Sequence, residues 1–116
     1  MAANTMPSTE EVFEMIDAAI KSDPSVTTGK EGVYQFYLQG DDGGTYQMII
    51  DDDGPRTVKG EEKDAQVTLT IDHNDLRDMV AGTLNPTAAF MGGKLKITGN
   101  MGLALKLQTV LNSFSF

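Results

Sequence analysis

His73 is the one histidine of the chain, and it lies in the stretch "DHND" with Asp72 and Asp75 close by. A histidine can act as a general base or bind a metal, but each role needs a nucleophile or a second ligand. The sequence supplies neither, and aspartates before an apolar helical pattern are typical of helix caps. We therefore interpret His73 as a solvent-exposed residue at a helix start and predict no catalytic role for it.

Two other stretches have residue types that can hold ions. The run Asp51–Asp53 invites a calcium interpretation, but Gly54 follows too soon and no glutamate closes the loop, so a hairpin turn is favoured. The stretch "TGNMG", residues 98–102, could present backbone amides to an anion, although it lacks the glycine spacing and lysine of a phosphate loop. The chain has no cysteine, which excludes disulfides, zinc thiolates and cysteine nucleophiles. These observations predict no metal, no cofactor and no enzymatic activity.

The charge of the chain is distributed unevenly. Its formal net charge is -8, and residues 1–78 hold all 17 acidic residues. Residues 79–116 hold no acidic residue and only three basic ones, Lys94, Lys96 and Lys106. An acidic chain without a basic cluster would be repelled by nucleic acid phosphates, so nucleic acid is not an expected partner. The three lysines could still attract an anionic headgroup or make transient contact with a membrane.

The length and composition indicate one soluble globular domain that spans residues 1–116. A chain of 116 residues can bury a sizeable core without disulfides, and 40% hydrophobic with 22% charged residues is an ordinary globular composition. The first residues lack a basic segment followed by an apolar segment, so we expect no signal peptide. No stretch approaches the roughly 18 apolar residues of a membrane span.

Hydrophobic periodicity predicts the elements of the first half. Residues 8–22 form a helix that begins with a capping box of Ser8 and Glu11, and Pro24 ends it. Residues 32–40 and 45–51 alternate apolar and polar side chains, as expected of two strands joined by the turn at residues 41–44. A short edge strand follows at residues 56–60.

The second half adds two strands and three helices. Residues 65–72 give the clearest strand pattern, and the short helices at 76–82 and 85–93 end in glycine. A fifth strand at 94–99 leads to a final helix that Asn100 caps. The order of elements predicts an α+β fold: a single five-stranded, mainly antiparallel sheet covered on one face by helices.

The final helix carries more apolar surface than one packing face needs. Between Met101 and Leu111 the only polar side chains are Lys106, Gln108 and Thr109, so the apolar arc exceeds the roughly 100° stripe of a surface helix. We expect this helix to be buried on two sides. One side would pack on the sheet, and the other on another helix, another chain or a ligand; an ordinary core helix remains an alternative.

The C-terminal region resembles a known family. The stretch "NPTAAFMGGKLKITGNMGLALKLQTVL" looks like the signature of the sterol carrier protein type 2 domain, a sterol-binding and lipid-transfer family. The opening "VFEMI", the strand "DAQVTLTID" and the step "MVAGTLNP" support the resemblance in order, over roughly residues 11–112. The family implies helices over one sheet face that enclose an apolar tunnel for fatty acids, acyl-CoA esters, sterols and phospholipids.

Carried over residue by residue, the resemblance implies a set of lipid-binding positions. Gln108 would supply a polar contact, or it is an exposed helix glutamine. Relatives often have two aromatic residues where this chain has Phe90 and Met91, which changes the expected shape of the tunnel. The implied lipid-binding residues are Met79, Leu84, Phe90, Met91, Ile97, Met101, Leu103, Ala104, Leu107, Gln108 and Leu111.

The expected function is non-enzymatic binding and intracellular transfer of lipids by a monomer. The alternative is an accessory domain that interacts with, or presents substrates to, lipid-metabolising enzymes. Peroxisomal relatives end in a Ser-Lys-Leu-like tripeptide, whereas this chain ends Phe114-Ser115-Phe116, so we expect an intracellular, cytoplasmic protein.

Overall fold

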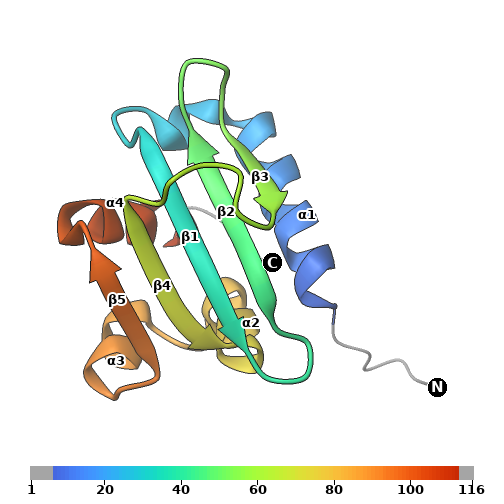
Figure 1. Ribbon diagram of the computed structural model, residues 1–116, viewed down its shortest axis with the longest axis vertical. Helices are drawn as coiled ribbons and strands as arrows, with labels where there is room; N and C mark the ends of the chain where they lie inside the picture. Colours follow the sequence, from blue (N-terminus) through green and yellow to red (C-terminus); the bar gives the residue numbers. More distant parts are fainter. Residues whose placement is uncertain (1–6, 113–116) are drawn as a thin grey trace.

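A five-stranded sheet lies at the centre of the structure. The computed structural model describes residues 7–112, with side chains described up to residue 110. Neighbouring strands are antiparallel, except that β1 and β4 are parallel. This confirms the predicted α+β fold with a mainly antiparallel sheet. The strands are β1 (Gly32–Gln39), β2 (Gly44–Ile50), β3 (Arg56–Lys59), β4 (Val67–Asp72) and β5 (Leu95–Gly99), in the spatial order β3-β2-β1-β4-β5 (Figure 1).

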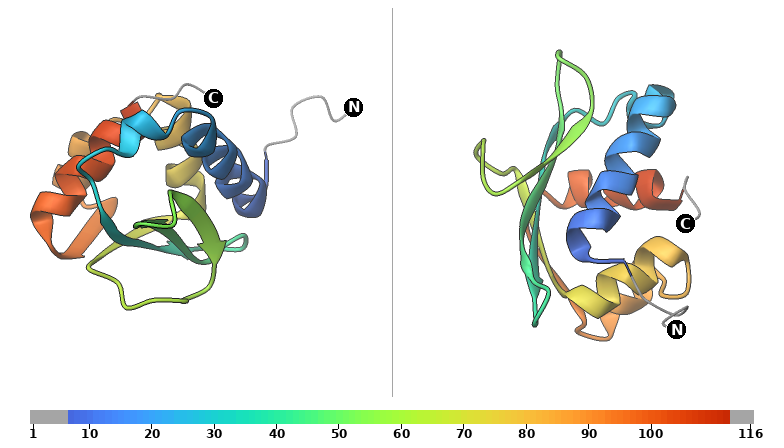
Figure 2. Two further views of the ribbon diagram at one scale, coloured as in Figure 1. Left: turned by 90° about the horizontal axis from the view of Figure 1, so that it is seen from above. Right: turned by 90° about the vertical axis from the view of Figure 1, so that its right-hand side faces the viewer.

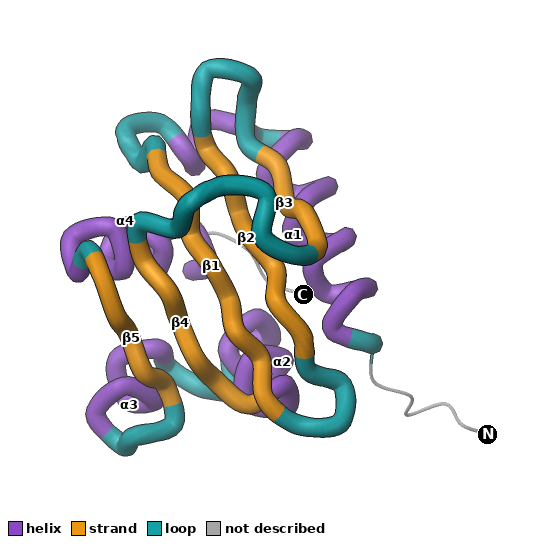
Figure 3. The backbone as a smooth tube through the Cα atoms, in the orientation of Figure 1, coloured by secondary structure: helices purple, strands orange, loops and turns teal. Residues whose placement is uncertain are grey.

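The parallel pair forces the chain to cross the sheet between β3 and β4. Residues 60–66 make this crossing over the outer face of the sheet (Figures 1 and 3). The fully buried Gln47 on β2 holds the crossing in place, because its Nε2 donates to Gln35 Oε1 (2.9 Å) and to the Lys63 carbonyl (2.7 Å). Its Oε1 accepts from the backbone amides of Glu62 and Lys63. A polar residue of the alternating pattern in residues 45–51 is therefore part of the interior.

The helices lie on the other face of the sheet. Seen from the side, the sheet forms one layer and the helices the second (Figure 2). Their order agrees with the prediction, apart from an additional short 3-10 helix at Pro24–Thr27. The α-helices are α1 (Thr9–Ser22), α2 (His73–Ala81), α3 (Pro86–Met91) and α4 (Met101–Asn112).

The start of α1 has the predicted capping box. The Ser8 amide donates to Glu11 Oε1 (2.9 Å), and the Glu11 amide donates to Ser8 Oγ (3.1 Å). The helix packs on the sheet through Phe13, whose ring stacks on Tyr46 with centroids 4.3 Å apart. It ends at Ser22, just before the proline, as predicted.

Arg77 ties α2 to other parts of the chain. Its Nε donates to the Pro7 carbonyl (2.6 Å), and its guanidinium also binds the carboxylate of Asp42. Nη1 lies 2.7 Å from Nδ1 of His73, which accepts because a guanidinium has only donors. Asp72 caps the helix by accepting from the Asn74 amide. His73 is half-buried in this contact, so the prediction of a solvent-exposed histidine was wrong.

The core fills the space between the sheet and the helices. Alternating side chains of β1 and β4 point into it, as the sequence pattern predicts, and α1, α2 and α4 supply the opposite wall. The sheet contributes, among others, the buried Tyr34, Phe36, Leu38, Val67, Leu69 and Ile71.

Candidate functional site

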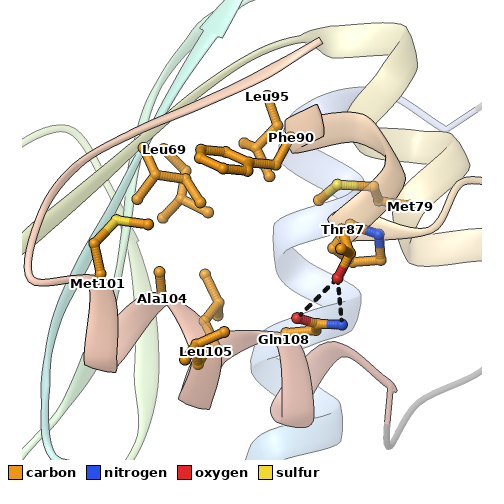
Figure 4. Close-up of a pocket in the computed structure, with 12 residues that line it drawn as sticks. Leu69, Met79, Thr87, Phe90, Leu95, Met101, Ala104, Leu105 and Gln108 are labelled. Carbon is orange, nitrogen blue, oxygen red and sulfur yellow. Dashed lines mark hydrogen bonds between the residues drawn. The ribbon is translucent and has the colours of Figure 1, made fainter. Parts of the chain in front are cut away.

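A pocket of about 150 Å³ lies between the edge of the sheet and the two C-terminal helices. Two residues of its lining, Thr87 and Gln108, are polar, and none has a side chain that titrates. Figure 4 shows the side chains converging from β4, β5, α2, α3 and α4. The lining consists of Leu69, Met79, Pro86, Thr87, Phe90, Leu95, Ile97, Met101, Ala104, Leu105, Leu107 and Gln108.

The sheet wall of the pocket follows from the pairing of β4 with β5. In this antiparallel pair Leu69 is opposite Ile97, and Ile71 is opposite Leu95. Side chains alternate between the faces of a strand, so Leu95 and Ile97 point inward together while their neighbours point outward. Two paired strands therefore present a continuous apolar surface to the helices.

Gly99 lets the chain turn from β5 into α4. Its φ of 99° lies in the left-handed region, and a Cβ there would lie 2.5 Å from the Gln66 carbonyl oxygen. Asn100 then caps α4, since its Oδ1 accepts from the Leu103 amide at 3.1 Å, as predicted. This close turn brings the first residues of α4 beside the inner face of β5.

The short helix α3 forms the wall opposite α4. Asn85 caps it by accepting from the amides of Thr87 (2.8 Å) and Ala88 (3.2 Å), and Pro86 occupies the first helical position. Ala89 is buried and anchors the helix. The next residue, Phe90, then points toward the pocket (Figure 4).

A hydrogen bond crosses the pocket between α3 and α4. Gln108 Nε2 donates to Thr87 Oγ1 at 3.2 Å, and the Thr87 hydroxyl also lies 3.5 Å from Gln108 Oε1 (Figure 4). These are the polar groups that the pocket offers to a ligand, and each partly satisfies the other in this structure.

The mouth of the pocket is an exposed apolar surface. Phe90, Met101 and Leu105 line the pocket yet are 43%, 47% and 66% exposed. The apolar arc of α4 is thus buried on one side, by Leu103, Ala104, Leu107 and Val110, and reaches solvent on the other. Burial of the second side of this helix by a ligand or another chain stays a prediction.

Seven of the residues implied by the resemblance lie together in this pocket. Leu84 packs against the core and Leu103 is buried near Gly32, so neither lines it. Met91 is 81% exposed and does not line the pocket, and the side chain of Leu111 lies outside those described. The seven are Met79, Phe90, Ile97, Met101, Ala104, Leu107 and Gln108.

Five lining residues were not among those implied. Leu69 and Leu95 are inward positions of strands, which the alternating pattern marks as core without distinguishing core from pocket. Pro86 and Thr87 begin α3, and Leu105 belongs to the exposed part of the apolar arc. The excess width of that arc was the signal that could have identified Leu105. The tunnel implied by the resemblance is not shown by the described residues, which form a pocket.

The remaining candidate motifs have structural partners. Asp51 binds Arg56 (2.9 Å) and Lys63 (3.0 Å), and these contacts hold its carboxyl pKa well below the usual range. The turn it begins joins β2 to β3, as predicted. Across residues 7–112, no three histidine, cysteine or acidic side chains group as metal ligands, and no helix has the length and hydropathy to cross a membrane.

The fold and the pocket define the class of the protein: an α+β domain of one sheet and one helical layer, with an apolar pocket between them. The sequence matches the SCP-2 sterol transfer family over residues 13–112, and the chain belongs to that family. It is similar to the sterol carrier protein domain 2 of Helicoverpa armigera, with 28% sequence identity. The two structures superpose with a TM-score of 0.78, and the match covers 89% of this chain and 84% of that one.

A second solved structure is a palmitated domain. It is SCP2L2 from Aedes aegypti, 26% identical with a TM-score of 0.73, and the match covers 95% of this chain and 99% of that one. In sequence, the chain is 39% identical over 107 residues to hydroxysteroid dehydrogenase-like protein 2 of Bos taurus. That match covers 91% of this chain but 25% of the relative, so the chain spans about a quarter of its length.

Proposed function

We propose that this chain acts as one domain that binds a lipid acyl chain or sterol in the pocket between β5, α3 and α4, and carries it between membranes inside the cell. The observation that carries the proposal is an apolar pocket whose mouth is itself apolar and exposed. A solvated apolar surface of this kind is typical of a binding site. The palmitated relative supports a fatty acyl ligand.

The energetics favour apolar burial over polar recognition. Each buried methylene contributes about 0.8 kcal/mol, so about 15 of them contribute roughly 12 kcal/mol before the costs of association. A single neutral hydrogen bond to Thr87 or Gln108 adds about 1 kcal/mol. We therefore expect broad selectivity among fatty acids, acyl-CoA esters, sterols and phospholipids, set by length and width more than by headgroup.

The pocket must widen to hold a whole lipid. At about 150 Å³ it is smaller than the roughly 300 Å³ at which ligand pockets begin. The side chains at the mouth, Phe90, Met101 and Leu105, are exposed and so have room to move. We expect the bound state to be a larger cavity in which these side chains cover the ligand.

The proposal includes no catalytic step. Acid-base catalysis needs a titratable side chain within hydrogen-bond reach of the reacting group, and the lining offers a hydroxyl and an amide. This lining favours a carrier over a hydrolase or isomerase.

Titration of the delipidated protein with a fluorescent fatty acid tests the proposal. Saturable binding at micromolar concentration, displaced by unlabelled palmitate, is the expected result. A folded protein that binds neither a fluorescent fatty acid nor a fluorescent sterol at that concentration would contradict it.

A second candidate is an accessory domain that presents lipids to an enzyme. The observation in its favour is that the dehydrogenase-like relatives are about four times longer than the region they share with this chain. Sedimentation of the purified protein distinguishes the two: a lipid-bound monomer favours the carrier, whereas a lipid-free oligomer that buries α4 favours docking.

A further inference from the structure

His73 and Arg77 contact each other across the first turn of α2. Arg77 Nη1 lies 2.7 Å from His73 Nδ1, and a guanidinium has only donors, so Nδ1 carries no proton in this structure. The side chain of Arg77 is only 9% exposed. A neutral His73 therefore accepts a hydrogen bond from a nearly buried cation, which a protonated His73 cannot do.

The imidazole ring is confined on its other side by the turn between β1 and β2. The ring lies against Gly40, where a Cβ would be 2.2 Å from His73 Cδ2 and 2.7 Å from Nε2. Only a residue without a side chain leaves this space, so the ring fits between α2 and the turn (Figure 1). The ring thus has no room to withdraw from Arg77 toward the turn.

Three charged side chains lie around His73 on the elements that pack together here. Arg77 belongs to α2, Asp42 to the turn between β1 and β2, and Asp72 to the end of β4. Asp42 already binds the Arg77 guanidinium and accepts from the Thr9 amide, and Asp72 already caps α2. The neutral ring carries its proton on Nε2, so a second proton goes to Nδ1, the atom that faces Arg77. With both side chains cationic, His73 and Arg77 compete for the Asp42 carboxylate.

Arg77 connects α2 to two other parts of the chain. Its Nε donates to the Pro7 carbonyl (2.6 Å), just before α1. Its Nη2 binds Asp42, which also accepts from the Thr9 amide at 2.8 Å. Displacement of the guanidinium therefore frees the first turn of α2 from both the β1–β2 turn and the start of α1. The same helix carries Met79 of the pocket wall.

We propose that His73 is an acid-sensitive switch on α2: protonation breaks its hydrogen bond with Arg77 and releases the helix from the β1–β2 turn and from the start of α1. The bond is complete where the imidazole is neutral and is lost as the pH falls through the range in which histidines titrate, roughly pH 8 to 5. One consequence rests on the proposed function: because Met79 moves with α2, the ligand should bind more weakly in acid.

Nuclear magnetic resonance of the full chain over this pH range tests the switch. The chain has one histidine, and its two arginines are Arg56 and Arg77, so the imidazole and guanidinium signals are readily assigned. The Arg77 Nε–H signal should shift with the same midpoint as the His73 ring signal, and the Arg56 signal should not. An Arg77 signal that stays constant while His73 titrates would overturn the proposal.

His73→Asn is the matched variant. Its amide oxygen can take the place of Nδ1 and accepts a hydrogen bond at any pH. At about pH 5.5 the Arg77 Nε–H of the original chain should exchange with solvent about tenfold faster than that of the variant, whereas at about pH 7.5 the rates should agree. Equal rates at the lower pH would refute the switch. If the variant does not fold, the comparison of midpoints in the original chain still decides.

The consequence for the pocket is measured with a fluorescent sterol, whose own charge does not change with pH. The original chain should bind the sterol more weakly at about pH 5.5 than at about pH 7.5, and His73→Asn should bind it equally at both. Equal binding by the original chain while Arg77 responds would refute the link from His73 to the pocket. Absence of binding at either pH would count against the proposed function, and the resonance test of the switch does not depend on it.

Discussion

Filling the pocket from within should separate its ligand affinity from the stability of the fold. Ala104 lies on the pocket wall, is 7% exposed and belongs to the first turn of α4. The substitution Ala104→Leu adds three carbon atoms that point into a space of about 150 Å³. The helix retains a residue with high helix propensity, so the backbone has no reason to change.

The expected loss of affinity follows from the methylenes that the new side chain displaces. If three ligand carbons are excluded, the loss is about 2.4 kcal/mol, or roughly 60-fold in dissociation constant. Filling an apolar space in a folded protein commonly raises its stability by about 0.5–2 kcal/mol. Ala104→Leu should therefore bind a fluorescent fatty acid more weakly and unfold at a higher temperature.

Ala88→Leu is the matched control. Ala88 is an exposed residue of α3 that does not line the pocket, so the same three carbons are added outside it. Both variants are titrated with the fluorescent fatty acid, and their thermal unfolding is followed by circular dichroism. A folded Ala104→Leu that retains the affinity of the original chain would refute the assignment of the pocket, as would equal weakening by Ala88→Leu.

Three further predictions concern stability. Burial, with a smaller effect of Glu31, raises the pKa of Tyr34 to about 12. The contribution of the neutral Tyr34 to stability should therefore be complete below about pH 10 and lost as the pH rises through 12. Absorbance titration of the protein, compared with Tyr34→Phe, checks this. The lowered pKa of Asp51 means that Asp51→Asn should be less stable than the original chain above about pH 4, and that urea unfolding should show the difference shrinking below that pH. Arg77→Met removes the guanidinium from Asp42, whose side chain is 42% exposed and still accepts from the Thr9 amide, so it should cost about 1–2 kcal/mol in urea unfolding; a change within about 0.5 kcal/mol would show that these contacts contribute little.

The elements of the fold could be predicted because their signals are local. The capping box at Ser8, the alternation in β1 and β4, and the glycine that ends α2 are each read within a few residues. The burial of Gln47 could not be predicted in this way. It depends on residues 60–66 crossing the outer face, which follows from the parallel pairing of β1 with β4.

The site was harder to predict because it depends on how short elements are rotated. Phe90 and Met91 are neighbours on α3, and neighbouring helical residues point about 100° apart, so one lines the pocket and the other faces solvent. The apolar arc of α4 showed that surplus apolar surface exists, but the position of α3 decides which part of it remains open. Asn85, which caps α3, and the buried Ala89 set the position of this six-residue helix.

The contact between α3 and α4 bears on the proposed lipid carrier, because it spans the small pocket that the lipid would have to widen. Widening it requires the Gln108 to Thr87 hydrogen bond, 3.2 Å long and partly solvated, to break at a net cost of about 1 kcal/mol. Two buried ligand methylenes contribute about 1.6 kcal/mol, which exceeds that cost. The contact can therefore close the empty pocket without preventing a chain of ordinary length from entering. The two polar groups it releases then become available to the ligand, so widening the pocket also supplies its polar contact.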